Sequence, residues 1–105
     1  MTSEFVEIQI TCGSDDEARS IADALVDRRL AACVQQLPMS STYRWEGAVE
    51  RDDEILLLIK TTGRRVGEVE ATVHALHSYD VPAFTVVEIA GGSAGYLAWL
   101  RDETS

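Results

Sequence analysis

Hydrophobic and polar residues alternate at the start of the chain and then recur at helical spacing. The alternation from Phe5 to Cys12 predicts a β-strand, with a core face made of Val6, Ile8 and Ile10. Ser14 and Glu17 then match a capping box, in which Ser14 binds a free backbone N–H and Glu17 reaches back. They predict the start of a helix whose apolar stripe is formed by Ala18, Ile21, Ala22, Leu25 and Leu30.

The longest patterned stretch runs from Cys33 to Thr61 and predicts one long β-hairpin. In its outgoing arm, Tyr43, Trp45 and Gly47 share one face, and the residues between them share the other. The return arm, from Glu54 onward, is apolar on both faces, which is typical of a strand in the middle of a sheet. The rest of the chain is expected to be organised around this hairpin.

Two positions compete for the turn of the hairpin. The polar cluster Arg51-Asp52-Asp53 is favoured, because the apolar pattern resumes at Ala48-Val49 before it stops. Gly47 is the alternative turn position. If the turn lies at the polar cluster, a glycine inside the strand indicates a bulge or a close backbone approach.

The remaining chain adds a helix, a strand and a short last helix. Valine and leucine at helical spacing predict a second helix from about Arg64 to His77. A fourth strand is predicted from Ala83 to Ile89, followed by a helix from Ala94 to Arg101 that Ser93 caps. The order βαββαβ predicts an α+β, ferredoxin-like fold, and right-handed crossovers place the first and third strands at the centre of its antiparallel sheet.

One face of this sheet is expected to have no helices covering it. Tyr43, Trp45 and alternate residues of the return strand need a partner on that face. An exposed apolar sheet face of this size is typical of an oligomer interface.

Composition limits the class of protein. At 105 residues the chain is expected to form a single domain, 1–105. The formal net charge of −9 argues against nucleic acid as a partner, because a phosphate backbone requires a basic surface. No apolar run approaches the roughly 20 residues of a membrane span, and Met1 to Phe5 lack the features of a signal peptide. A cytoplasmic protein is therefore expected, with Cys12 and Cys33 as reduced thiols outside any CxxC motif.

Five motifs follow one another along the chain: Leu30-Ala31-Ala32-Cys33-Val34, Tyr43-Arg44-Trp45-Glu46-Gly47, Leu58-Ile59-Lys60-Thr61-Thr62, His77-Ser78-Tyr79-Asp80-Val81-Pro82 and Tyr96-Leu97-Ala98-Trp99-Leu100. In this order and spacing they resemble the CutA divalent-cation tolerance proteins, over almost the whole chain. The resemblance implies a ferredoxin-like subunit of a tight homotrimer, with long hairpins that pair between neighbours. It also implies a role in tolerance of copper and other divalent metals.

Metal binding is the first activity that this resemblance implies. Family members with proposed copper ligands carry a cysteine near the end of the first strand and two adjacent histidines after the second helix. The cysteine position falls on Ile10 here, with Cys12 two residues further on and on the same face, and the histidine pair falls on Leu76 and His77. His77 and Cys12 are therefore the candidate ligands for Cu(II) or another divalent cation, since imidazole and thiolate both bind copper. Alternatively, His77 bonds to the last carbonyls of its own helix.

The two cysteines have different expected environments. Cys33 begins a strand inside an apolar run and is expected to be a small buried hydrophobe. Cys12 precedes Gly13 at the start of a helix, where the helix N-terminus can lower the pKa of a thiol.

A small-molecule or anion sensor is the alternative function, because the fold also resembles that of PII-type signalling trimers. Arg44, Trp45, Lys60 and Tyr79 could line a cleft between subunits, with polar tips around an aromatic floor. The competing interpretation is interface packing, in which such side chains are common anyway. An enzyme is not expected, because no nucleophile or carboxylate pair has partners at a recognisable spacing and no phosphate-binding glycine loop is present.

Overall fold

The computed structural model describes residues 4–105. The stretch compared above with a signal peptide begins at Met1, and its first three residues lie outside this range. None of the described helices is long and apolar enough to cross a membrane. In chain order, the elements are β1 (Phe5–Cys12), α1 (Asp15–Asp27), β2 (Cys33–Trp45), β3 (Ala48–Thr62), the 3-10 turn η1 (Gly63–Arg65), α2 (Val66–Leu76), β4 (Phe84–Glu88) and α3 (Ala94–Glu103).

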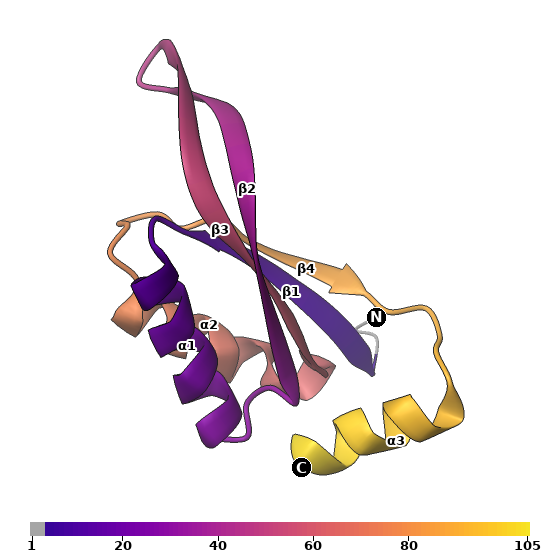
Figure 1. Cartoon of the computed structure of the whole chain (residues 1–105). Coiled ribbons are helices and arrows are strands. Elements are labelled where there is room, and N and C mark those ends of the chain that lie inside the picture. Colours follow the sequence, from indigo (N-terminus) through magenta and orange to yellow (C-terminus); the bar gives the residue numbers. More distant parts are fainter. Residues whose placement is uncertain (1–3) are drawn as a thin grey trace.

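The strands form one antiparallel sheet in the order β2-β3-β1-β4 (Figure 1). β1 and β3 lie at its centre, as the right-handed crossovers predicted. β1 pairs with β3 along its whole length, from Phe5 opposite Thr62 to Cys12 opposite Ile55. The predicted α+β, ferredoxin-like βαββαβ arrangement is therefore confirmed.

The core lies between the sheet and the helices α1 and α2, which cover the same face (Figure 1). Val6, Ile8 and Ile10 of β1 are fully buried in it, as the alternation predicted. β3 contributes Leu57 and Ile59 to the same layer. The helices complete the core with Ala18, Ile21, Leu25, Val69 and Val73.

The turn of the long hairpin lies at Glu46-Gly47, so the prediction of a turn at residues 51–53 is wrong. Glu46 and Gly47 have φ values of 49° and 83°, and a two-residue turn with two positive φ angles matches the twist of the flanking strands. The polar cluster at 51–53 stays extended because each of its residues pairs with one on β2, as Arg51 does with Thr42. Gly47 therefore marks the turn, and no bulge is needed to explain it.

The helix ends match the predictions in part. Ser14 caps α1, because its Oγ accepts a hydrogen bond from the backbone N–H of Glu17 at 3.2 Å. The carboxylate of Glu17 does not reach back as the capping box predicted; it instead accepts hydrogen bonds from Ser78. The second predicted helix begins as the 3-10 turn η1 and continues as α2. Ser93 stands at the N-cap of α3, although its side chain makes no capping bond.

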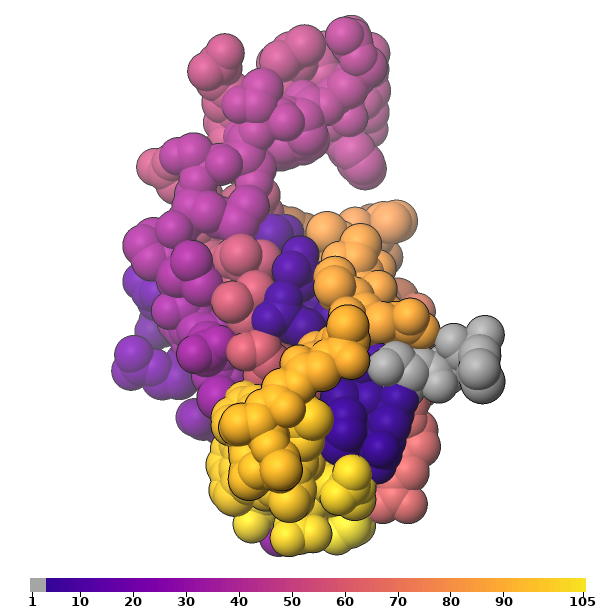
Figure 2. Space-filling view, turned by 90° about the vertical axis from the view of Figure 1, so that its right-hand side faces the viewer, coloured from indigo at the N-terminus to yellow at the C-terminus, as the bar shows by residue number. Residues whose placement is uncertain are grey.

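The hairpin projects well beyond the rest of the chain (Figures 1 and 2). All residues from Thr42 to Asp53 are exposed, and the chain measures 44 Å along its longest axis against 25 and 22 Å along the others. Trp45, at 56% exposure, and Tyr43, at 40%, are large aromatic side chains on this projection. Nothing within residues 4–105 covers the tip of the hairpin.

The last helix lies at the other end of the molecule from the hairpin tip (Figure 2). Leu100 and Thr104 are fully buried where α3 packs on the sheet face opposite α1 and α2. Thr62 contacts Thr104 there and Arg101 lies over the Phe5 ring, so the expectation that no helix covers this face is wrong at this end of the sheet. The Thr104 carbonyl accepts a hydrogen bond from Arg65 at 2.8 Å, which fastens the end of α3 to the start of α2. Tyr96 and Trp99, whose ring centroids are 5.6 Å apart, remain 42% exposed on its outer side.

Candidate functional site

His77, the strongest candidate ligand, is held by the protein through both ring nitrogens. Its side chain is fully buried. The backbone N–H of Tyr79 donates to Nδ1 at 3.1 Å, so Nε2 carries the proton and donates to the Thr11 carbonyl at 2.7 Å. The predicted alternative, in which His77 bonds to the last carbonyls of its own helix, is wrong, because its partner lies at the end of β1.

Glu17 and Ser78 extend the contacts of His77 into a network. Glu17 Oε1 lies 3.5 Å from His77 Nδ1 and accepts a hydrogen bond from the Ser78 backbone N–H at 2.6 Å. The other carboxylate oxygen accepts from Ser78 Oγ at 3.0 Å. The Tyr79 ring packs against the imidazole with centroids 4.7 Å apart. The network joins the end of β1, the start of α1 and the loop after α2, so a metal ion at His77 would have to displace one of these contacts.

Cys12, the second candidate ligand, lies fully buried at the end of β1. Burial, followed by the nearby charges of Glu17 and Glu54, raises the pKa of the Cys12 thiol to about 11. The expected lowering of this pKa by the helix N-terminus is therefore wrong, because the thiol meets carboxylates and apolar side chains there. A protonated thiol is a poor metal ligand, so a metal bound at Cys12 has to displace a proton that is held tightly.

The other predicted positions also differ from a ready-made metal site. Ile10 is buried in the core and Leu76 is partly exposed, and neither side chain can bind a metal. Cys33, expected to be buried, is only partly so. Within residues 4–105, no group of three or more His, Cys, Asp or Glu side chains is arranged to hold a metal ion. His77 and Cys12 therefore stay predictions, and a complete site needs ligands from a second chain or a rearrangement.

The four predicted cleft residues lie in three different places in the chain. Lys60 lies on the sheet face opposite α1 and α2. Its Nζ is 3.5 Å from Glu7 Oε1 and donates a hydrogen bond to Gln35 at 3.0 Å. Tyr79 lies in the loop after α2, and Arg44 and Trp45 are near the hairpin turn. One chain does not form the predicted cleft, which remains a prediction about an assembly.

Sequence reasoning missed the contact that positions Tyr79. The Tyr79 hydroxyl crosses Gly13 and donates to Glu54 at 3.4 Å. A Cβ atom at position 13 would lie 3.1 Å from that oxygen, so glycine leaves room for the phenol. The local pattern marks Gly13 only as the end of a strand and Glu54 only as part of the return arm, because the two are far apart in sequence.

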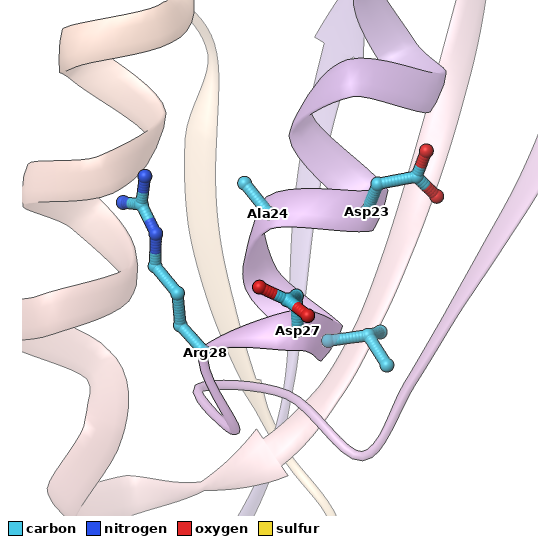
Figure 3. A pocket seen from close by; sticks show the side chains of 5 residues that line it. Asp23, Ala24, Asp27 and Arg28 are labelled. Atoms are coloured by element: carbon cyan, nitrogen blue, oxygen red, sulfur yellow. The ribbon is translucent and has the colours of Figure 1, made fainter.

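Two hollows lie on the surface, and the first of them adjoins Gly13 and Glu54. The first, of about 440 Å³, lies between the start of α1 and the stem of the hairpin, and is lined by Gly13, Ser14, Asp15, Pro38, Met39, Ser40, Asp53, Glu54 and Ile55. The second, of about 550 Å³, is lined by Asp23, Ala24, Val26, Asp27 and Arg28 (Figure 3). All five residues of the second hollow come from the end of α1, so no second element closes over it.

Fold and surface together define a ferredoxin-like subunit with a long projecting hairpin and a second sheet face that α3 covers at one end only. A family model described as CutA1 divalent ion tolerance protein matches residues 6–103. The chain belongs to this family, and the resemblance carried by the five motifs is confirmed.

Individual relatives agree with this assignment. The "Divalent-cation tolerance protein CutA" of Thermus thermophilus is 48% identical over 92% of this chain and 95% of its own length. "Protein CutA" of Homo sapiens is 38% identical over 90% of this chain, which spans only 54% of the human protein. Among solved structures, the divalent cation tolerance protein of Thermus thermophilus has a TM-score of 0.94 at 46% identity, covering 96% of this chain and 99% of its own. A structure described as the periplasmic divalent cation tolerance protein CutA of Archaeoglobus fulgidus has a TM-score of 0.95 at 35% identity, covering 96% and 99%.

Proposed function

We propose that the chain acts in tolerance of divalent cations as one subunit of a homotrimer, and that it binds such cations weakly. The observation that carries the assembly is the exposure of Trp45 and Tyr43 on a hairpin that nothing in the described chain covers. An isolated two-stranded ribbon is marginally stable in water, and exposed aromatic side chains of this size are typical of an interface. Neighbouring subunits would cover both the ribbon and the open sheet face.

The cation-binding part of the proposal rests on the family and on the chemistry of His77. Imidazole is a good ligand for Cu(II) and other late divalent metals. Because both ring nitrogens are occupied in the single chain, binding exchanges the bond to Thr11 or to Tyr79 for a bond to the metal. This exchange lowers the affinity, which suits a role in tolerance of excess metal better than one in storage at trace concentration. We further propose that the protein is cytoplasmic and has no catalytic step.

Calorimetric titration of the chelator-stripped protein with Cu(II) tests the cation part. The essential comparison is a His77→Ala variant beside a His74→Ala variant, because His74 is half-exposed on α2, where it lies 4.0 Å from Glu70 and edge-on to the Phe84 ring. Stoichiometric binding that His77→Ala abolishes and His74→Ala retains supports the proposed site. Binding that is absent, or equal in both variants, overturns it.

The proposed homotrimer is tested separately, by measuring the mass of the assembly. Sedimentation velocity in physiological salt should give the mass of three subunits, and Trp45→Ala should shift that distribution toward smaller species. A single-subunit mass for the unmodified protein at all concentrations contradicts the trimer and leaves the metal titration unaffected.

A further inference from the structure

In the outer part of the hairpin, residues 42–52, the basic and the acidic side chains of the two paired strands lie on opposite faces. In the register of β2 and β3, Thr42 lies opposite Arg51 and Arg44 opposite Val49, so these four residues share one face. We refer to Thr42, Arg44, Val49 and Arg51 as the cationic face. Asp53 continues this face toward the body, opposite Ser40, which donates a hydrogen bond to it at 3.2 Å.

The acidic face of the ribbon consists of Tyr43, Trp45, Glu50 and Asp52, and Glu54 continues it toward the body. The Tyr43 hydroxyl donates a hydrogen bond to Asp52 on the neighbouring strand. This bond, with the charges of Glu54 and Glu50 nearby, raises the pKa of Tyr43 to about 12.

Neither face of the ribbon forms an ion pair within residues 4–105. Across residues 4–105, Arg44, Arg51 and Glu50 take part in no ion pair. All three are exposed. The arginines and the carboxylates lie on opposite sides of a ribbon one strand thick, so they are turned away from one another.

We propose that the cationic face of one copy packs against the acidic face of the next copy, with Arg44 and Arg51 pairing with Glu50 and Asp52 across the subunit boundary. This inference rests on the homotrimer proposed above and assigns the residues that set its geometry. The partner is a second copy of this chain because each face supplies the charge that the other lacks. Trp45, beside Tyr43 on the acidic face, supplies the apolar area that such a contact buries.

The opposite charges of the two faces also restrict the symmetry of the assembly. A two-fold contact would place identical faces together and set arginine against arginine or carboxylate against carboxylate. Unlike faces can meet only head to tail, and a head-to-tail contact that closes produces a ring. The charge pattern therefore favours a closed ring over a two-fold dimer, and the number of three subunits comes from the homotrimer proposed above.

Three variants test this pairing. Arg44→Glu/Arg51→Glu makes both faces acidic, Glu50→Arg/Asp52→Arg makes both faces cationic, and the fourfold variant exchanges the two faces. Arg19→Glu/Arg28→Glu is the control for the first variant, because it makes the same change in net charge at exposed positions of α1 and its end. Circular dichroism checks that each subunit remains folded, which the exposure of all four hairpin positions leads us to expect.

The readout is native mass spectrometry of tagged and untagged protein after mixing, which gives both the mass and the rate of subunit exchange. Each single-face reversal should accelerate exchange at least about tenfold or yield free subunits, because like charges then meet at the boundary. The fourfold variant should return to the rate of the unmodified protein, and the control should match it throughout.

Two results overturn the pairing and leave the trimer standing. One is a trimer whose exchange rate is unchanged by either reversal. The other is a fourfold variant that exchanges as fast as its parents, since the charges would then act within a subunit and not between subunits. A single-subunit mass for the unmodified protein overturns the trimer and the pairing together.

Discussion

The helix-covered body and the projecting hairpin are built from the same strands but are stabilised differently. Leu57 of β3 is fully buried beneath the helices, whereas Val49, eight residues earlier on the same strand, is 59% exposed. Backbone pairing with β2 is continuous between them. The difference lies in what covers the side chains: the helices bury Leu57, and nothing within residues 4–105 buries Val49.

Two raised pKa values show the same contrast. Burial raises the pKa of the Cys12 thiol in the body to about 11. A hydrogen bond to Asp52 raises the pKa of the Tyr43 phenol on the hairpin to about 12. In the body the main cause is removal from water, and on the ribbon it is a hydrogen bond that holds the phenol proton.

Trp45→Ala is expected to have the largest effect, and that effect should fall on assembly. If neighbouring subunits bury the ring, its removal should destabilise the trimer by about 3–5 kcal/mol. Urea unfolding at a concentration that keeps the protein trimeric measures this. A change below about 0.5 kcal/mol, the range of ordinary surface substitutions, would show that the ring stays in water.

Leu57→Ala should destabilise the helix-covered body whether or not the subunits associate. The leucine is fully buried in the core, so its truncation should reduce the free energy of unfolding by about 2–5 kcal/mol. Val49→Ala is the matched change on the exposed part of the same strand. In dissociated subunits it should cost under about 0.5 kcal/mol, and equal losses at both positions would contradict the contrast between body and hairpin.

Local pattern was enough to predict the body. Alternation identified Val6, Ile8 and Ile10 as core residues, and the order of elements identified β1 and β3 as the central strands. These features depend on sequence neighbours and on the handedness of crossovers. The core of the body was therefore predictable from the chain alone.

The candidate site depends on contacts that no local pattern encodes. The bond from His77 to Thr11 spans 66 residues, and the bond from Ser78 to Glu17 spans 61. Both depend on where the loop after α2 returns to the sheet, which the residues around His77 do not determine. The part of the capping-box prediction that concerned Glu17 was wrong for the same reason, since its carboxylate accepts hydrogen bonds from the distant Ser78.

Gly47→Ala sharpens the comparison at the hairpin turn. Gly47 has a φ of 83° and open space around it, so alanine there meets strain but no clash. The cost should be about 1 kcal/mol, in line with the left-handed conformation that a side chain disfavours. Gly67→Ala on α2 is the opposite control: it should stabilise by roughly 0.5–1 kcal/mol, because glycine weakens a helix. Equal effects at the two positions in urea unfolding would contradict the assigned turn.

Cys12 gives the most selective effect, because its contribution to stability changes only at alkaline pH. Because burial raises its pKa from an ordinary value of 9.0 to about 11, the folded protein keeps the thiol proton over a pH range in which the unfolded chain loses it. The resulting contribution to stability is complete below pH 9 and is lost as the pH rises through about 11. At pH 8 a thiol reagent should modify the partly exposed Cys33 before the buried Cys12.

Urea unfolding of the unmodified protein and of Cys12→Ala, measured from pH 8 to pH 11, isolates this contribution. Tyrosine and lysine titrate in both proteins, so the difference between the two curves reports on Cys12 alone. We expect the stability advantage of the unmodified protein to shrink steadily across this range. A difference that does not depend on pH would mean that the thiol ionises as easily in the fold as in the unfolded chain. Burial and the charges of Glu17 and Glu54 would then have no measurable effect on the pKa of Cys12. The fraction of Cys12 present as thiolate near neutral pH would equal that of an exposed cysteine, and this thiolate could bind a metal ion.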